Sequence, residues 1–547
     1  MRGMMQDVPL ALPAILRRIE RQFGHKTVTS ASVNDEIVAT WAQVGENARR
    51  IVGVLEALNV AQDALVGTLG WNTQRHVELY LGVPCGGRTL HTMNHRLGAE
   101  QIRYIVNDAA DEVIFVDRSL LEVLWPLASD LPTVRWFVVM DDGADAPLPN
   151  DPRLLDYDAL VAAASPANLP HIDEDRGASL CYTSGTTGNP KGVLYSHRSI
   201  VLHALMLLMV DSHGISESDV LMPIVPMFHV NAWGFPYAAM MVGADLVLPG
   251  PAMGAEDLMA QMVRHKVTFA AAVATVWHGM AALLGDGHDL SNVRKLACGG
   301  GAVPDSLSKQ WEDATGVPLT NGWGMTETSP VVTAGRLATG HRGLPAAERR
   351  RILGSPGPAL PLCEVRIVDD AGKTVAWDAT SPGELQVSGP TVASAYFGAN
   401  RDEDAFTADG WLRTGDVATI DGLGYVRIVD RTKDLVKSGG EWISSVDLEN
   451  AIMGHSDVAE AAVIGIPHEK WGERPLACVV RRSGSNLSSD DLSEYLRDHV
   501  ASWWIPDQFE FLDVIPKTST GKFSKQDLRR KLHSKYNTEA ASRGSRA

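Results

Sequence analysis

Short apolar runs alternate with longer amphipathic stretches along most of the first 330 residues. In residues 41–58, Val44, Ala48, Ile51 and Leu55 recur at helical spacing. Strand-like apolar runs occupy residues 65–69, 112–116, 136–140, 244–248 and 267–273. Strands that alternate with helices predict a layered α/β domain.

The pattern changes twice in the second half. Glycines and prolines cluster over residues 340–362, and residues 383–396 then resemble short β-structure, which predicts a β-rich subdomain. Beyond residue 430, helix-like and strand-like segments make up a smaller α+β unit: helices over 446–453 and 487–499, strands over 459–466, 476–480 and 510–515. We therefore predict an α/β fold with an N-terminal domain at residues 1–430, a hinge at 431–434, a small α+β domain at 435–535 and a disordered tail at 536–547.

Composition narrows the functional classes. The chain has 547 residues and a net charge of −17, which disfavours a protein that wraps nucleic acid. Its five cysteines are widely spaced and lack a CxxC pair, so a disulfide framework and a thiolate zinc site are both disfavoured. The uncharged stretch at 220–244 contains three prolines, which favours a buried segment over a membrane span. With no evident signal peptide and no Ser-Lys-Leu ending, we expect a cytoplasmic protein without integral membrane association.

One loop has the composition of a phosphate site. Residues 182–192 read Tyr-Thr-Ser-Gly-Thr-Thr-Gly-Asn-Pro-Lys-Gly and follow the apolar residues 178–181. Glycines let backbone N–H groups converge, hydroxyls add donors, and Lys191 adds a positive charge, which together suit a polyphosphate. The loop is not a Walker A motif, because no Gly-Lys-Ser/Thr closes it. A flexible polar surface loop is the alternative interpretation.

Five further motifs accompany this loop: Gly-Gly-Gly-Ala-Val-Pro at 299–304, Gly-Trp-Gly-Met-Thr-Glu at 322–327, Gly-Trp-Leu-Arg-Thr-Gly-Asp at 410–416, Asp-Arg-Thr-Lys-Asp at 430–434 and Pro-Lys-Thr-Ser-Thr-Gly-Lys at 516–522. Together they resemble the adenylate-forming superfamily of acyl-CoA synthetases, peptide-synthetase adenylation domains and luciferase. The resemblance implies ATP, Mg²⁺ and coenzyme A as cofactors or substrates, and a C-terminal domain that moves about Lys433.

The resemblance also assigns roles to individual residues. Trp323 is expected to stack on adenine, Asp416 and Arg431 to hold the ribose, and Thr326 to contact the α-phosphate. Glu327 and Thr183 are the expected Mg²⁺ ligands, while Lys522, Thr326 and His229 are the expected catalytic residues. The full predicted nucleotide site comprises Thr183, Ser184, Gly185, Thr186, Thr187, Gly188, Lys191, Gly300, Gly301, Ala302, Trp323, Gly324, Met325, Thr326, Asp416, Arg431 and Lys522.

The segment at residues 226–236 indicates which kind of carboxylic acid the resemblance implies as the substrate. Amino-acid-activating relatives usually place an aspartate just after the phenylalanine, whereas this chain has His229, Val230 and Asn231. The stretch resembles medium- and long-chain fatty acyl-CoA synthetases, in which the residue matching Trp233 gates an acyl tunnel, and also 3-methylmercaptopropionate-CoA ligases. Plain core packing is the alternative for Trp233. His229 either shapes the site or accepts a thiol proton.

Residues 437–444 resemble the family's thioester-step motif. Gly439 and Gly440 leave room for a pantetheine arm, and Glu441 and Trp442 complete the predicted CoA site. A carrier-protein arm would fit the same room. We therefore expect an AMP-forming acyl-CoA ligase for a medium- or long-chain fatty acid. The alternatives are a short-chain or 3-methylmercaptopropionate ligase and a non-catalytic nucleotide-binding protein. A homodimer is also expected from the resemblance.

Overall fold

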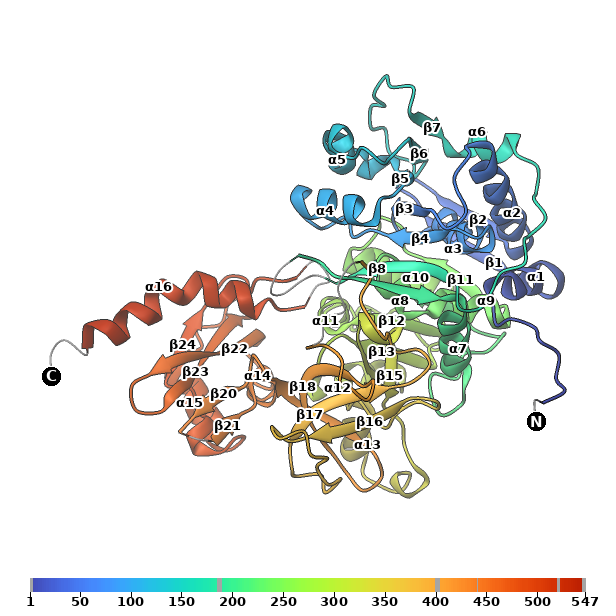
Figure 1. The fold of residues 1–547 in the computed structure, drawn as a ribbon. Helices are drawn as coiled ribbons and strands as arrows, with labels where there is room; N and C mark the ends of the chain where they lie inside the picture. The colour runs from blue at the N-terminus through green and yellow to red at the C-terminus, as the bar shows by residue number, and fades with distance from the viewer. Residues whose placement is uncertain (1–2, 184–188, 399–403, 440, 519–521, 544–547) are drawn as a thin grey trace.

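The computed structural model describes residues 3–183, 189–398, 404–439, 441–518 and 522–543. It has a large N-terminal body and a smaller C-terminal domain beside it, coloured orange to red in Figure 1. This α/β architecture with a separate small α+β unit confirms the predicted fold class.

The first layer is a seven-stranded sheet with the order β7-β6-β5-β3-β4-β8-β9, parallel except for the terminal β8–β9 pair. Helices α4 and α5 share a core with its outer face. Its elements are β3 (Leu65–Leu69), α3 (Gln74–Cys85), β4 (Thr89–Thr92), α4 (Ala99–Ala109), β5 (Val113–Asp117), α5 (Leu121–Leu124), β6 (Trp136–Met140), β7 (Leu154–Asp156), α6 (Tyr157–Ala163), β8 (Gly177–Tyr182) and β9 (Gly192–Ser196).

The second layer is an eight-stranded sheet with the order β15-β14-β13-β12-β10-β11-β1-β2, antiparallel only at its two edges. Helices α10, α11 and α12 pack on its outer face around Trp277 and Trp311. The elements are β1 (Thr27–Ala31), β2 (Glu36–Thr40), β10 (Val220–Pro223), β11 (Asp245–Leu248), α10 (Ala255–Arg264), β12 (Phe269–Val273), α11 (Ala274–Ala281), β13 (Lys295–Gly299), α12 (Asp305–Thr315), β14 (Leu319–Gly324) and β15 (Val331–Ala334).

A single core fills the space between the two sheets. Five helices contribute to it: α1 (Leu12–Gln22), α2 (Trp41–Ala57), α3, α7 (His197–Leu208) and α9 (Phe235–Val242). Helix α2 begins at a capping box, in which the Thr40 hydroxyl accepts from the Gln43 backbone N–H and the Gln43 side chain accepts in return. The predicted buried segment at 220–244 forms β10, the turn α8 (Val230–Trp233) and α9. No helix in the described part of the chain is long and apolar enough to cross a membrane.

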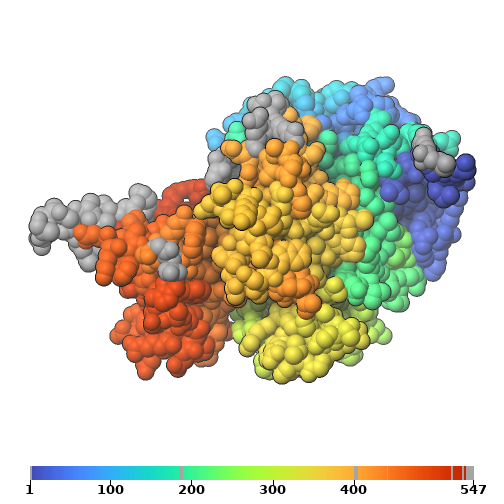
Figure 2. All heavy atoms as spheres, turned by 60° about the horizontal axis from the view of Figure 1, so that its bottom comes forward, coloured from blue at the N-terminus to red at the C-terminus, as the bar shows by residue number. Residues whose placement is uncertain are grey.

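A four-stranded antiparallel subdomain follows and leads into the C-terminal domain. Figure 2 shows the two in contact, and Arg427 of β19 pairs with Asp447 of α14 at 2.8 Å. The elements are α13 (Ala346–Gly354), β16 (Glu364–Val368), β17 (Gly383–Ser388), β18 (Leu412–Ile420), β19 (Val426–Arg431), β20 (Val436–Ser438), β21 (Glu441–Ile443), α14 (Ser445–Met453), β22 (Val458–His468), β23 (Gly472–Arg481), α15 (Ser489–Arg497), β24 (Gln508–Phe511) and α16 (Lys525–Arg543).

Most predicted elements coincide with observed ones, and three need correction. The expected β-structure over 383–396 ends with β17 at Ser388, and the expected strand over 510–515 is the earlier β24. Residues 536–543 continue α16 and are not a disordered tail, because Tyr536 is buried against the C-terminal sheet. Residues 544–547 lie outside the described residues.

Trp311 offers a test of the outer core. The side chain is fully buried, its indole N–H donates to the Trp277 carbonyl at 3.2 Å, and the two rings meet edge-on. We predict that Trp311→Ala lowers the free energy of unfolding of the N-terminal domain by about 3–5 kcal/mol through the cavity it leaves. Urea denaturation measures the loss. The half-exposed Trp377 provides the control, and an equal effect of Trp377→Ala would contradict the assignment.

Candidate active site

Asp416 of β18 contacts side chains from two other strands, β14 and β19. It is buried in β18, accepts a hydrogen bond from the Trp323 indole N–H of β14 at 2.9 Å, and pairs with the Arg431 guanidinium at the end of β19 at 3.2 Å. Burial raises the pKa of the Asp416 carboxyl, against the opposing effects of Arg431 and Trp323. The structure therefore brings together three predicted nucleotide-binding residues, one from each of three strands.

Lys522 reaches the same place from the C-terminal domain. A Cβ built on Gly300 would lie 2.7 Å from Lys522 Cε and 3.3 Å from its ammonium nitrogen, so the lysine lies across the glycine turn after β13. Gly300 has φ +78°, which favours glycine. Burial and the Arg431 charge, partly opposed by Asp416, lower the pKa of Lys522 to about 8. The neighbouring Gly301 and Ala302 are exposed.

The base of the predicted phosphate loop is closed by backbone contacts. The Thr183 N–H donates to the Lys191 carbonyl at 2.9 Å, and the Lys191 N–H donates to the Thr183 hydroxyl at 3.4 Å. The Lys191 ammonium lies 4.9 Å from the centre of the Tyr396 ring, and the Tyr396 hydroxyl donates to Glu327 at 2.6 Å. Tyr396 thus links Lys191 to Glu327, a role that sequence reasoning missed. Ser184, Gly185, Thr186, Thr187 and Gly188 lie outside the described residues.

Thr326 and Glu327 are held rigidly in a short 3₁₀ turn after β14. Both are buried; the Tyr195 hydroxyl donates to the Thr326 carbonyl at 2.6 Å, and the Ala393 N–H donates to the Glu327 carbonyl at 2.7 Å. A close approach explains Gly324, where a Cβ would lie 1.9 Å from the Pro330 carbonyl. Met325 follows it, and its carbonyl accepts from the Thr328 hydroxyl.

The predicted Mg²⁺ ligands form a sparse set. Within the described ranges, no group of three His, Cys, Asp or Glu side chains could hold a metal. Glu327 and Thr183 nevertheless fit Mg²⁺, because this ion usually takes one or two protein oxygens and fills its other positions with phosphate oxygens and water.

Trp233 sits at the end of a strained turn. Val230, Asn231, Ala232 and Trp233 all have φ between 49° and 56°. Left-handed backbone costs about 1–2 kcal/mol per non-glycine residue, and such strain concentrates at functional sites. The Asn231 side-chain carbonyl accepts from the Ser179 hydroxyl at 3.1 Å, which ties the turn to β8. The turn places the buried Trp233 indole against Gly299, where a Cβ would lie 3.0 Å from the ring.

His229 begins this turn and faces the nucleotide side. Burial, together with the smaller effect of the nearby Lys522 ammonium, lowers the pKa of His229 to about 3. The imidazole is therefore neutral at physiological pH, and its basicity depends on where Lys522 is.

The predicted CoA residues lie elsewhere in this structure. Gly439 packs on Trp471, to whose carbonyl its N–H donates at 2.8 Å, and borders a cleft of about 670 Å³ within the C-terminal domain. Trp442 is 44% exposed, Gly440 lies outside the described residues, and Glu441 belongs to β21. The structure thus unites Lys522 with the nucleotide residues but does not bring Gly439 or Trp442 to His229 and Trp233.

The predicted hinge residue is exposed. Lys433 follows the last residue of β19 by two positions, and its carbonyl accepts from the Arg529 guanidinium of α16 at 3.3 Å. Burial of part of its side chain lowers the pKa of Lys433. Lys433 lies between the two domains, which is where the predicted hinge would have to lie.

Comparison with known proteins gives consistent matches over the whole chain. The AMP-binding enzyme model matches residues 16–397, and the AMP-binding enzyme C-terminal domain model matches residues 447–522. Similar curated proteins are a long-chain-fatty-acid–CoA ligase from Thermus thermophilus, 45% identical, and a 3-methylmercaptopropionyl-CoA ligase from Ruegeria pomeroyi, 41% identical. A medium-chain-fatty-acid–CoA ligase from Ectopseudomonas oleovorans is 40% identical. These alignments cover 97% of this chain and 97–98% of each relative.

Solved structures of other proteins share the fold of this chain. The anthranilate CoA ligase AuaEII in complex with anthranoyl-AMP has a TM-score of 0.85 at 27% identity, covering 98% of this chain and all of that one. ATP-bound MatB from Rhodopseudomonas palustris has a TM-score of 0.82 at 25% identity, covering 97% of this chain and all of that one. From the two matched models and the relatives similar over nearly its full length, we conclude that this chain belongs to the AMP-binding enzyme family.

Proposed function

We propose that this enzyme activates a medium- or long-chain fatty acid with ATP and transfers the acyl group to coenzyme A. By its family and its relatives the chain is an AMP-forming acid–CoA ligase. The identity of the acid and the roles of individual residues are the parts that we propose.

The proposed acid rests on one observation, the surface of the strands β12, β13 and β14 beneath Trp233. Gly299 of β13 pairs with Gly322 of β14, and Ala297 pairs with Ala271 of β12. Because alternate residues of a strand share a face, Gly299 and Ala297 form one continuous strip of small residues. A flexible alkyl chain fits along such a strip once the Trp233 indole moves aside, so Trp233 acts as a gate.

In the first half-reaction the acid attacks the α-phosphorus of ATP and releases pyrophosphate. Asp416 and Arg431 hold the ribose, and Trp323, whose N–H is bonded to Asp416, supplies an aromatic face for adenine. The Lys522 ammonium offsets the charge that develops on the phosphate. Glu327 and Thr183 would hold Mg²⁺, which supplies further charge neutralisation when bound.

In the second half-reaction the CoA thiol attacks the acyl adenylate. Lys522 leaves the cleft by rotation of the C-terminal domain about Lys433, and the surface around Gly439 takes its place. This surface carries the cleft lined by Trp471 and Trp503, whose aromatic faces suit stacking with the nucleotide end of CoA, while Arg474 in the same cleft is paired with Asp507 at 2.7 Å. Departure of the Lys522 charge makes His229 more basic, which suits acceptance of the thiol proton.

A second candidate acid is 3-methylmercaptopropionate. The 3-methylmercaptopropionyl-CoA ligase, at 41% identity, lies between the long-chain ligase at 45% and the medium-chain ligase at 40%, so overall likeness does not separate the two. Direct comparison of the two kinds of acid as substrates distinguishes the two candidates.

A substrate screen tests the proposed acid. We predict that CoA-thioester formation with ATP and Mg²⁺ peaks on straight-chain acids of six to sixteen carbons. Pyrophosphate is measured in parallel. A peak on 3-methylmercaptopropionate would favour the second candidate, and pyrophosphate without thioester would point to a carrier-protein acceptor.

Trp233→Ala tests the gate. Removal of the indole from the strip should raise the ratio of kcat/KM for hexadecanoate to that for octanoate severalfold. Trp377→Ala, a half-exposed tryptophan of the β-rich subdomain, provides the control and should leave the ratio unchanged. An unchanged ratio in Trp233→Ala would mean that the indole only packs.

The pH dependence of adenylation tests Lys522. Because the lysine acts as a cation and its pKa is about 8, kcat/KM for ATP in pyrophosphate release should fall as pH rises through about 8. Lys522→Arg should remove this fall, because arginine stays charged. Lys522→Ala should lower the rate by about 10²–10³. Thioester formation from preformed acyl adenylate should keep its rate in Lys522→Ala, and a loss of both half-reactions would contradict the assignment.

The glycine turn after β13 gives a matched pair of variants. A methyl on Gly300 would displace the end of the Lys522 side chain and would also occupy a residue with φ +78°, whereas no described atom lies within 4 Å of a Cβ on Gly301. We predict that Gly300→Ala reduces pyrophosphate release at least tenfold more than Gly301→Ala does. Equal effects would show that Lys522 does not cross Gly300 during adenylation. Rapid-quench measurement of the first turnover compares the two.

A further inference from the structure

His213 is a buried histidine that the proposed mechanism does not use. Its side chain is 3% exposed, and neither ring nitrogen has a hydrogen-bond partner among the residues that the structure describes. A neutral imidazole carries one donor and one acceptor, and buried polar groups are nearly always paired with protein, water or ligand. Burial lowers the pKa of His213 well below its usual value, so the ring is neutral. Neither hydrogen-bonding atom is used by the residues that the structure describes.

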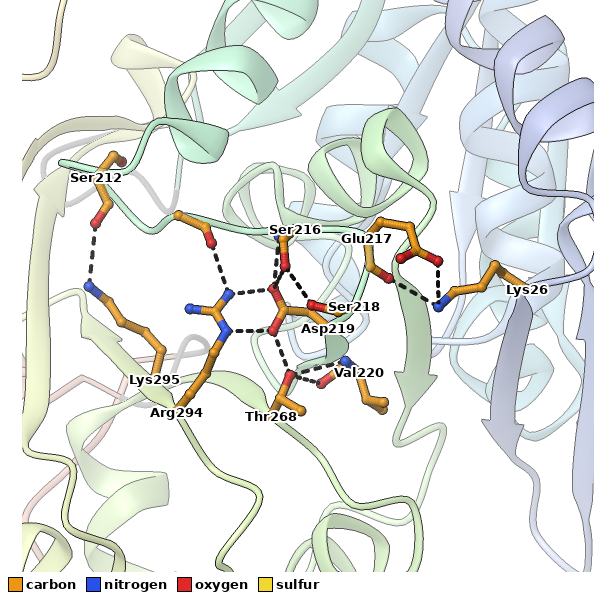
Figure 3. A network of polar contacts seen from close by, with 11 residues as sticks. Lys26, Ser212, Ser216, Glu217, Ser218, Asp219, Val220, Thr268, Arg294 and Lys295 are labelled. Carbon is orange, nitrogen blue, oxygen red and sulfur yellow. Dashed lines mark hydrogen bonds and ion pairs between the residues drawn. The ribbon is translucent and has the colours of Figure 1, made fainter.

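The turn that carries His213 is fixed on both sides. The Lys295 ammonium donates to the Ser212 carbonyl at 3.3 Å, and the Arg294 guanidinium donates to the Gly214 carbonyl at 2.9 Å (Figure 3). Arg294 is itself held by Asp219, to which its Nε donates at 2.6 Å. Both cations come from the start of β13 or the residue before it. The turn after α7 is therefore tied to the sheet, which fixes the backbone on both sides of His213.

Packing directs the ring inward. The His213 ring meets Phe235 of α9 edge-on at 5.3 Å between centroids and Phe269 of β12 at 5.9 Å. A Cβ placed on Gly322 would lie 3.9 Å from His213 Nε2, and its nearest neighbour would be Val331 Cγ1 at 3.7 Å. A carbon-sized atom above Gly322 therefore fits in ordinary contact with the imidazole.

This position lies directly behind the gate. Gly322 pairs with Gly299, which underlies Trp233, and Phe235 contacts both Trp233, at 6.5 Å between centroids, and His213. The strip of small residues thus runs from the reacting end of the cleft to an unpaired imidazole. An entirely apolar acyl chain would offer neither nitrogen a hydrogen-bond partner, which is unfavourable for a buried imidazole.

We propose that His213 recognises the far end of the acyl chain by a hydrogen bond to a neutral oxygen, so that the preferred acids end in a hydroxyl or carbonyl group. This inference rests on the proposed function, because it places the acyl chain beneath Trp233. A neutral oxygen matches the neutral imidazole, and the two nearby cations are directed elsewhere: Lys295 to the Ser212 carbonyl, and Arg294 to Asp219 and the Gly214 carbonyl.

The test compares matched pairs of acids. Thioester formation by the full-length enzyme is measured for straight-chain acids of four to twelve carbons, and for the ω-hydroxy acid, the ω-oxo acid and the dicarboxylic acid of each length. At the length whose terminal oxygen reaches His213, kcat/KM for the ω-hydroxy or ω-oxo acid should exceed that for the plain acid roughly tenfold, the value of one well-made hydrogen bond. The preference should appear in KM more than in kcat.

Two variants separate recognition from packing. His213→Phe keeps a ring of similar size and removes both polar atoms, so the ratio should fall to one or below. His213→Gln keeps a donor and an acceptor and should retain a ratio above one. Melting temperatures within a few degrees of the parent's show that both variants fold, and the ratio, taken within each variant, is independent of any general loss of activity.

Each remaining outcome contradicts this inference. Equal use of plain and oxygen-bearing acids at every length would mean that water satisfies His213. A preference for the dicarboxylic acid would contradict the neutral-oxygen assignment, and an unchanged ratio in His213→Phe would place recognition elsewhere. Failure of every ω-hydroxy and ω-oxo acid also overturns it. Thioester formation from the plain acids then decides the proposed function separately, since that function requires no terminal oxygen.

Discussion

The buried carboxylate of Asp416 is the contact on which the arrangement of the cleft depends. It belongs to the β-rich subdomain, accepts from Trp323 of the eight-stranded sheet, and pairs with Arg431, the last residue of β19 and the first of the predicted hinge. Lys522 of the C-terminal domain is close enough to act on the same carboxylate electrostatically. A carboxylate inside protein is unfavourable without such partners. The position of each domain at the cleft is therefore coupled to this one charge.

The cost of building the cleft is visible around that carboxylate. Lys522 and His229 both lose proton affinity through burial, and four consecutive residues from Val230 to Trp233 adopt left-handed backbone. These are local penalties that a well-packed core elsewhere in the domain must offset. Their concentration in one place is typical of a site arranged for a ligand, because a bound nucleotide would place negative charge beside the Lys522 ammonium.

The sequence predicts the parts of this protein that are local. Residues 65–69 and 136–140 coincide with β3 and β6, because a run of apolar residues between turns has few alternatives in a parallel sheet. The motifs around Asp416 and Lys522 are also local in sequence, and their resemblance to a known family makes them recognisable. Tyr396 was not predictable, because its partner Glu327 is 69 residues away in sequence. The left-handed turn was also hidden, since Val230 and Trp233 disfavour positive φ and only tertiary packing imposes it.

Separation of Lys522 from Gly439 gives the small domain its proposed function. The two groups belong to the same domain, yet one lies in the cleft while the other borders a different cavity, so in this arrangement only Lys522 is placed to serve the adenylate. The same movement also changes proton affinities. Burial is the main cause of the lowered pKa of His229, and with Lys522 inserted its charge lowers that pKa as well. When Lys522 withdraws, that second cause is removed, and His229 gains basicity at the step where a thiol proton must leave. A domain rotation can thus select which group carries a proton without any change in the residues of the cleft.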